Sequence, residues 1–179
     1  FVDISGEHTG DVLDTSSSSN SDSDADSSAS LTVSAIRTGS SEGSGTSGSV
    51  GSALTGTYGQ LTIAADGSYS YVANQSAADD LDAGDIVTDS FNYTVSDGIA
   101  TDTAVITITV IGVNDAPVAD NETGAVNEDA TLTVSDGTSD LLHGDTDADD
   151  SASLTISAIR TGAEGASGTA GSIGSGLTG

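Results

Sequence analysis

Apolar and polar side chains alternate with a period of two along much of the chain, which is the pattern of β-strands that bury one face. The clearest pair of segments is Leu61–Ile63 and Tyr69–Tyr71, which flank the tripeptide Ala65–Gly67. An Asp-Gly dipeptide between two alternating segments is a strong hairpin signal, because the turn needs backbone conformations that Gly adopts without strain. The sequence therefore predicts an antiparallel hairpin over residues 61–71.

A second pair of strands is predicted further along the chain. Phe91, Tyr93 and Val95 share one face of the first strand, and the turn residues Ser-Asp-Gly follow at 96–98. The second strand is longer, and one of its faces carries Ala104, Ile106, Ile108 and Val110. Both strands are expected to contribute to the core, because each presents an unbroken apolar face.

The remaining elements are weaker. Leu31, Val33 and Ala35 indicate an earlier strand, and residues 75–81 (QSAADDL) could form one helical turn. No segment has the apolar period of a longer helix. Short strands joined by Gly, Asp and Ser turns predict an all-β fold, an immunoglobulin-like antiparallel β-sandwich of about seven strands per repeat. A closed β-barrel remains the structural alternative.

An internal repeat organises the chain. Residues 31–56 and 154–179 align without a gap at an offset of 154 − 31 = 123, and 18 of the 26 positions are identical. The match extends upstream, where DSDAD at 22–26 aligns with DTDAD at 145–149. Fixed-period self-similarity is the signature of tandem-repeat proteins. The first copy has a Ser-rich run before its DSDAD, which we interpret as a surface-loop insertion.

The two copies are unequally represented. We assign residues 1–115 to a nearly complete β-sandwich repeat that lacks its first segment, and residues 116–179 to the first half of the next repeat. Five of the six aromatic residues lie between Tyr58 and Tyr93, and none lies in 116–179. The second copy therefore lacks half of its core, and a longer tandem array is expected.

Charge excludes several classes of function. The chain has 28 acidic and two basic side chains and a formal net charge of −26. Nucleic acid is excluded as a partner, because phosphate binding needs Lys and Arg, and no apolar run approaches the ~20 residues that membrane insertion requires. Cys and Lys are absent, which excludes disulfides, thiolate metal sites and Schiff-base chemistry. No catalytic constellation is present, and we predict that the protein is not an enzyme.

The acidic residues form two matching clusters. Alternate carboxylates stand at Asp22, Asp24 and Asp26 and again at Asp145, Asp147 and Asp149. Ca²⁺ takes 6–8 oxygen ligands, so closely spaced Asp side chains and carbonyl groups suit it. The alternative is a solvated acidic loop, but like charges at this density favour a counter-ion.

Three segments together resemble a known family. TYGQLTIAADGSYSY, LDAGDIVTDSFNYTVSDG and VITITVIGVNDAP, in this order, are similar to the VCBS repeat, a cadherin-like module found in tandem in large secreted bacterial RTX-type adhesins. The resemblance covers essentially the whole chain. It implies tandem cadherin-like sandwiches displayed outside the cell, with calcium between successive domains. The Gly-rich RTX nonapeptide is absent from this sequence.

The resemblance also implies candidate calcium ligands. Asn114 and Asp115 correspond to the linker ligands, and Asp145 and Asp147 to the ligand pair of the following domain. Asp82 and Asp85 stand where cadherins have an Asp-Arg-Glu motif, and Asp85 is shorter by a methylene than the Glu it would replace. Glu128 corresponds to the early-domain Glu, and Asp97 to the Asp of the Asp-Gly turn, where a plain turn residue is the equal alternative.

These features lead to one functional expectation. We expect a calcium-rigidified structural and adhesive repeat, secreted or held at the bacterial cell surface, that serves attachment or biofilm formation. Its partners would be neighbouring repeats of the same chain or identical chains in a fibre, with surface glycans as a further partner. The alternatives are a carbohydrate-binding β-sandwich module and a subunit of a head-to-tail complemented filament.

Overall fold

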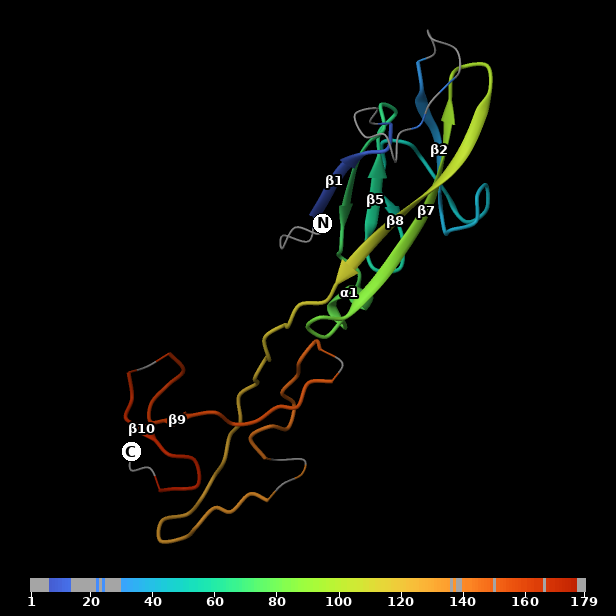
Figure 1. Cartoon of the computed structure of the whole chain (residues 1–179). Coiled ribbons are helices and arrows are strands. Elements are labelled where there is room, and N and C mark those ends of the chain that lie inside the picture. The colour runs from blue at the N-terminus through green and yellow to red at the C-terminus, as the bar shows by residue number, and fades with distance from the viewer. Residues whose placement is uncertain are drawn as a thin grey trace. The chain divides into compact units, whose positions relative to one another are not determined.

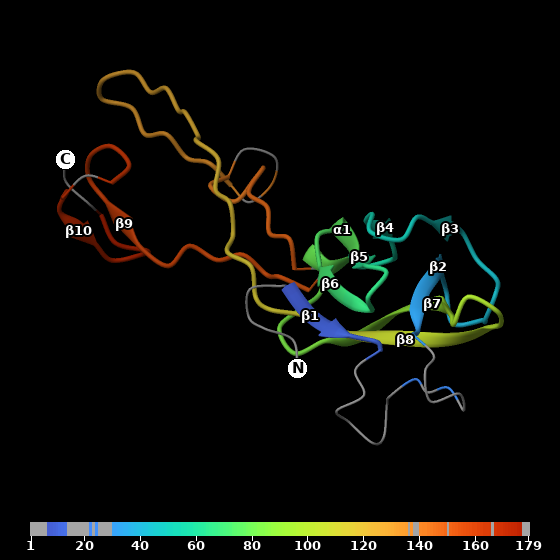
Figure 2. The same cartoon turned by 90° about the horizontal axis from the view of Figure 1, so that it is seen from above.

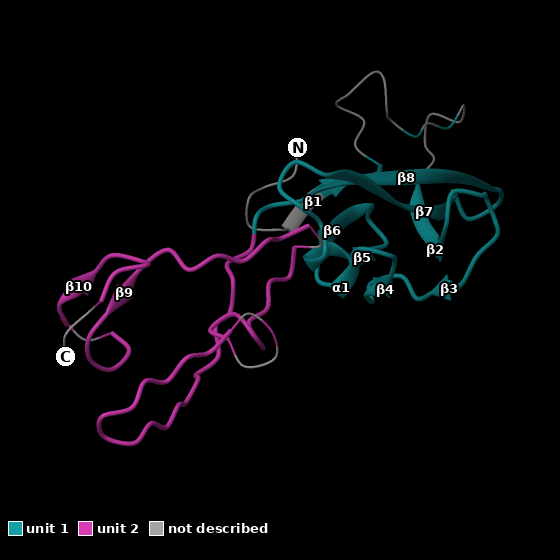
Figure 3. Cartoon of the chain, turned by 90° about the horizontal axis from the view of Figure 1, so that it is seen from below, with its two compact units in different colours: residues 1–114 teal, residues 115–179 magenta. Residues whose placement is uncertain are grey.

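The computed structural model describes residues 7–13, 22, 24, 30–135, 137, 140–149, 151–165 and 167–176 (Figure 1). The chain divides into two compact units, residues 1–114 and 115–179, which we call unit 1 and unit 2 (Figure 3). Unit 1 holds strands β1 to β8 and the helix α1, and unit 2 holds the short strands β9 and β10.

Unit 1 is built from two four-stranded antiparallel sheets, seen as separate layers in Figure 2. One sheet has the order β1 (Glu7–Asp11), β6 (Ser68–Val72), β5 (Gln60–Ile63), β4 (Leu54–Thr55). The other has the order β3 (Ser47–Gly48), β2 (Thr32–Thr38), β7 (Ile86–Ser96), β8 (Thr101–Ile111). A single helical turn, α1 (Ser76–Asp79), connects β6 to β7. The predicted all-β sandwich is confirmed.

The core lies between the two sheets, where the sequence pattern placed it. The hairpin over residues 61–71 is β5–β6, and Leu61, Ile63 and Tyr71 from it are at most 2 % exposed. From the other sheet, Phe91, Tyr93 and Val95 face the same interior. The rings of Tyr71 and Phe91 meet edge to face, with centroids 6.3 Å apart, so an aromatic contact joins β6 to β7.

Strand β2 departs from the alternation that the sequence suggested. Val33 is buried as expected, but the next buried side chain is Ile36, at 1 % exposure, and Ala35 is only half-buried. The pairing with β7 shifts register between Val33 and Ala35. An extra residue at a β-bulge reverses the faces of all residues beyond it, so the predicted strand is present but its buried face passes from Val33 to Ile36 rather than to Ala35.

The buried carboxylate of Asp89 organises a loop of unit 1. Asp89 accepts hydrogen bonds from the Thr57 and Tyr58 amides, both at 3.0 Å, and from the Tyr71 hydroxyl at 2.8 Å. Burial, followed by the hydrogen bond and charge of Asp89, raises the pKa of Tyr71. Asp89 is 4 % exposed, and its three donors replace the water that an ionised carboxylate loses on burial.

Unit 2 contains less regular structure. Strands β9 (Ile159–Arg160) and β10 (Ala170–Gly171) form an antiparallel pair, and Val118 and Thr146 form an isolated antiparallel bridge. Among its described residues, no other strand is present. The repeat boundary at 115/116 stays a prediction, since the division into units reflects contacts within each unit rather than repeat identity.

Candidate metal centres

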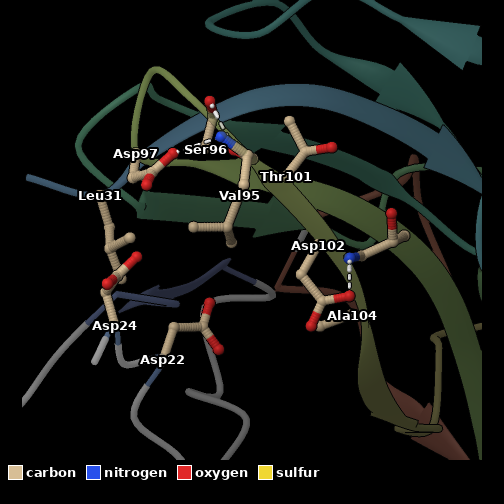
Figure 4. A pocket seen from close by; sticks show the side chains of 11 residues that line it. Asp22, Asp24, Leu31, Val95, Ser96, Asp97, Thr101, Asp102 and Ala104 are labelled. Carbon is tan, nitrogen blue, oxygen red and sulfur yellow. Dashed lines mark hydrogen bonds between the residues drawn. The ribbon is translucent and has the colours of Figure 1, made fainter. Parts of the chain in front are cut away.

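The first candidate centre is an open acidic pocket at the β7–β8 turn of unit 1. Its cavity volume is about 390 Å³, and Asp22, Asp24, Asp97 and Asp102 contribute carboxylates to its lining (Figure 4). Three of these four residues were predicted ligands, and Asp97 lies far in the sequence from Asp22 and Asp24. The strand pairing of β2 with the end of β7 explains their approach, because Leu31, next to β2, lines the same pocket as Val95 and Ser96.

Asp22 is tied to the core beneath the pocket. The Tyr93 hydroxyl donates to Asp22 Oδ2 at 3.2 Å, and Tyr93 itself is only 6 % exposed. Burial, followed by the charge of Asp22 and this hydrogen bond, raises the pKa of Tyr93 to about 12. Tyr93 therefore remains a donor at physiological pH and holds one Asp22 oxygen in place. The third residue of this predicted cluster, Asp26, lies outside the described residues.

Asp97 divides its role between the pocket and the turn. Its Oδ1 accepts the amide groups of Ile99 at 2.8 Å and Ala100 at 2.6 Å. These two bonds, Ala100 first, lower the pKa of the Asp97 carboxyl. Asp97 therefore acts as a turn residue and also lines the pocket, and its role as a calcium ligand stays a prediction.

Sequence reasoning missed Asp102 as a member of this pocket. The backbone amide of the next residue, Thr103, donates to Asp102 Oδ1 at 2.9 Å. The signal was present in the alternation of β8, since Asp102 continues the face of Ala104 and Ile106 toward the turn. A charged residue at the end of the core-facing side of a strand indicates that the core is open to solvent at that end.

Asp82 and Asp85 lie at the opposite end of the β7–β8 hairpin. The Gly112 amide donates to the Asp85 carbonyl at 2.9 Å, and the Gly84 amide donates to the Gly112 carbonyl at 3.1 Å. These backbone bonds hold the turn before β7 against the end of β8. Asp82 is half-buried and Asp85 exposed.

The two acidic regions of unit 1 are separated by the length of the hairpin. β7 and β8 pair over 11 residues each, from Ile86–Ile111 to Ser96–Thr101. At ~3.4 Å per residue the two regions lie about 34 Å apart. The predicted ligands of unit 1 therefore form two separate groups, one at each end.

The second candidate centre lies within unit 2. Carboxylate oxygens of Asp120, Glu122 and Asp145 all lie within 4.8 Å of one another. The Val118–Thr146 bridge brings the two segments together, and the Asp120 amide donates to Asp145 Oδ1 at 2.9 Å. Gly144 leaves room for the group, because a Cβ atom there would stand 2.7 Å from Asp120 Oδ2.

Like charges crowd this centre. The hydrogen bond with the Asp120 carboxyl, then burial, then the charges of Asp120 and Asp145 raise the pKa of Glu122. Of the predicted ligands only Asp145 belongs to the group, and Asp120 and Glu122 were missed. Their alternate positions after the Asn-Asp-Ala-Pro segment were the available signal, but the bridge that aligns them with Asp145 joins residues far apart in sequence.

The other predicted ligands of unit 2 are arranged differently. Asp149 Oδ2 accepts the Asp115 amide at 3.2 Å, and Asp147 Oδ1 accepts the Asp149 amide at 3.0 Å. Asp115 and Asp149 are thus brought together, whereas the linker hypothesis pairs Asn114 and Asp115 with Asp145 and Asp147 and stays a prediction. Glu128 is exposed in a turn closed by the Ala130 amide and the Asn127 carbonyl. Asn114, the last residue of unit 1, is exposed.

The donor atoms of both centres suit a hard divalent cation. They are carboxylate oxygens, with no Cys in the chain and no Arg in either group. Oxygen-only sites favour calcium or magnesium over zinc or copper. A bound cation would also offset the charges of Asp120 and Asp145, which contribute to the raised pKa of Glu122 after its hydrogen bond with Asp120 and burial.

Comparison with known proteins gives one family. The family model of the bacterial cadherin-like domain matches residues 3–112, which include every strand of unit 1. A comparison with curated proteins finds no match. Among the described residues, no helix has the length and apolar character to cross a membrane.

Proposed function

The chain belongs to the bacterial cadherin-like domain family, and from this premise we propose that it is a calcium-stabilised structural and adhesive repeat of an extracellular bacterial protein. The convergence of Asp120, Glu122 and Asp145 within 4.8 Å carries the calcium part of the proposal. The sandwich of unit 1 supplies a rigid spacer with acidic groups at both ends of its long hairpin.

Calcium would act through folding equilibria rather than through chemistry on a substrate. A net charge of −26 opposes compaction. Asp22, Asp24, Asp97 and Asp102 would hold an ion in unit 1, and Asp120, Glu122 and Asp145 would hold one in unit 2. An ion that binds only the folded chain adds its binding free energy to stability. Low calcium would therefore favour a loose chain for secretion, and millimolar calcium outside the cell would favour the folded one.

The proposed partners follow from the same arrangement. Neighbouring repeats of the same chain, or identical chains in a fibre, would adjoin each end of a unit and share its carboxylates. The context of a VCBS-type RTX adhesin and a role in cell attachment or biofilm formation belong to this proposal. Surface glycans are a further proposed target, and a glycan array probed with the full chain in calcium would identify them.

Calcium titration of the full chain tests the proposal. Isothermal titration calorimetry should detect binding, and Glu122→Gln with Asp145→Asn should remove one class of sites. Asp22→Asn with Asp24→Asn should remove another. The matched controls are Glu164→Gln and Glu42→Gln, which neutralise exposed loop residues outside both centres and should leave binding unchanged. A full chain that binds no calcium at millimolar concentration would contradict the proposal.

A further inference from the structure

A second pocket of unit 1 is lined by hydroxyl groups and shares no residue with the acidic pocket. Its cavity volume is about 510 Å³, within the ~300–1,000 Å³ typical of sites for small ligands. Seven of its ten lining residues are Ser or Thr, and the others are two Gly and Asp89. None of the described residues that line it is aromatic or basic.

The pocket forms where β2 ends and β7 continues. β2 pairs with β7 as far as Thr38, and the Gly39 amide then donates to the Ser90 carbonyl at 2.8 Å. Beyond this point the chain turns away from β7, and Thr88 has a paired strand, β8, on one side only. Residues 55–57, which follow from β4, supply the opposite wall. All of the lining therefore belongs to residues 38–90.

Two buried polar side chains hold the walls of this pocket. Asn92 is 1 % exposed, and its Nδ2 lies 3.0–3.3 Å from three carbonyl oxygens of residues 38–44. Its Oδ1 accepts the Gly43 amide at 3.1 Å. Asp89 holds residues 55–57 through the Thr57 amide at 3.0 Å. Because these bonds fix the backbone in the absence of a ligand, the lining hydroxyls are preorganised.

The outer face of β7 and β8 has an unexpected charge distribution. The two strands lie in the layer opposite β5 and β6, so their other face is on the outside (Figure 2). Of the twelve outward positions, eight are Ser or Thr and four are Asn, Val or Ile. The acidic residues of the two strands, Asp89 and Asp102, both stand on the core-facing side. Charged side chains normally face solvent, so an uncharged outer face in a chain with 28 acidic residues indicates a surface that receives a neutral partner.

The hydroxyls of the outer face continue those of the pocket. Thr88 and Ser90, which line the pocket, pair in register with Thr109 and Thr107 of β8. The hydroxyl oxygens of Ser90 and Thr107 are 3.5 Å apart, and both threonines of β8 are exposed. Pocket and strand therefore present one surface of the same chemistry.

The lining selects against charged ligands. An anion would find no basic residue in the described lining and would approach a chain of net charge −26. A cation would find one carboxylate, Asp89, whose two oxygens already accept three hydrogen bonds. Ser and Thr hydroxyls both donate and accept, and a ligand that does the same satisfies them. Sugar hydroxyls have this property, and sugar C–H groups suit the threonine methyls.

From this chemistry we infer that the pocket binds a neutral saccharide chain, with one sugar in the pocket and its neighbours against Thr107 and Thr109. The inference rests on the glycan part of the proposed function and names the site and the charge of that ligand. It does not involve the acidic pocket, because Thr88 and Ser96 are eight residues apart on β7, which is about 27 Å at ~3.4 Å per residue.

The test is a titration of the isotope-labelled full chain in calcium, followed by backbone NMR. The probes are neutral hexasaccharides of glucose, galactose, mannose or N-acetylglucosamine, each compared with its monosaccharide. At least one hexasaccharide should shift the amide signals of residues 55–57 and 88–90 and leave those of 95–104 unchanged. It should bind about tenfold or more tightly than its monosaccharide, because the sugars on β8 add contacts. Polygalacturonate, an anionic chain, should not bind.

Three variants replace a hydroxyl by a methyl and keep the β-branched shape that suits these positions. Thr57→Val with Thr88→Val should weaken hexasaccharide binding about tenfold or more, because each lost hydrogen bond counts separately. Thr109→Val should weaken binding of the hexasaccharide and leave that of the monosaccharide unchanged. The matched control is Thr32→Val, at an exposed position of β2 outside the pocket, which should change neither affinity.

The outcomes separate this inference from the calcium proposal. A chain that binds a hexasaccharide but no calcium would contradict only the calcium proposal. Failure of every hexasaccharide to shift residues 55–57 and 88–90, or equal weakening by Thr32→Val, would overturn the inference. Equal affinity for hexasaccharide and monosaccharide would overturn the extension of the site onto β8. Shifts of the same signals with protein concentration alone would show that a second copy covers this face and would overturn the saccharide assignment.

Discussion

Asp89 is a buried acceptor in the interior of unit 1. It is the acceptor for two backbone amides and one buried hydroxyl. Asp89→Ala leaves these three donors without partners, and each buried unsatisfied donor costs about 1–3 kcal/mol. We expect a loss of about 2–3 kcal/mol, because the hydroxyl bond is buried and the two amide bonds are part-buried, measured by urea unfolding of the full chain. Tyr71→Phe removes one of the bonds and should cost about 1 kcal/mol. Glu42→Ala, in an exposed loop, should be neutral.

Glu122 reports the state of the second candidate centre. Its pKa is raised in the folded chain, so its favourable contribution is complete below the unfolded pKa and is lost as pH rises through the folded value. Without calcium, the 115–149 region should therefore loosen as pH rises from about 4 toward neutrality. With calcium the trend should reverse, because the ion requires ionised carboxylates.

Carboxyl-resolved NMR measures this behaviour directly. The Glu122 side-chain signal should titrate at a raised pKa in chelator and shift on addition of calcium. The Glu164 signal, from an exposed loop of the same unit, should not respond to calcium. A Glu122 signal that calcium leaves unchanged would remove this centre from consideration.

At the scale of elements, the β7–β8 turn depends on Asp97. Its pKa is lowered, so the stability it contributes is present above the unfolded pKa and is lost as pH falls through the folded value. Asp97→Ala should open the turn locally, because the Ile99 and Ala100 amides lose their acceptor. Hydrogen exchange at these two amides should accelerate. Asp102→Ala, on the adjacent strand, should leave hydrogen exchange at these two amides unchanged. The comparison of the two variants separates the stability of the turn from the charge of the pocket.

The elements that the sequence predicted are those with local signals. The β5–β6 hairpin followed from Asp66-Gly67, and the buried faces of β7 and β8 followed from unbroken alternation. Strand β1 (EHTGD) was not predicted, because none of its residues has a large hydrophobic side chain and its pairing with β6 joins distant segments. The bulge in β2 was also missed, since nothing in Val33–Ile36 distinguishes an extra residue from regular alternation.

The candidate sites show the same division. Spacing alone indicated acidic ligands at Asp22, Asp24 and Asp145. Their partners could be identified only from the pairing of β7 with β8 and of Val118 with Thr146. These partners are Asp102, Asp120 and Glu122. Long-range strand pairs bring such residues together, and a single sequence contains no direct record of them.

For the whole molecule, calcium should change stability more than magnesium does. At a hundred times its dissociation constant, an ion at one site contributes ~2.7 kcal/mol, which corresponds to a rise in Tm on the order of 10 °C for a unit of this size. Calorimetry at fixed ionic strength separates binding from screening of the net charge. Magnesium should give a smaller shift, because it demands octahedral geometry and dehydrates reluctantly. Equal shifts with both ions would indicate screening alone.

The repeated hairpin also determines where a protease can cut. Trypsin cleaves after Lys and Arg, and the chain offers only Arg37 and Arg160, which occupy equivalent positions of β2 and β9. Arg37 is half-buried in a strand paired on both sides and donates to the Gly45 carbonyl, whereas Arg160 is exposed at an edge. Cleavage requires local opening, so trypsin should release residues 161–179 first and leave 1–160 as a persistent fragment. If Arg160 were protected by packing against another segment, the rates of cleavage at Arg37 and at Arg160 would become similar. A single gel would then compare the two copies of the repeat.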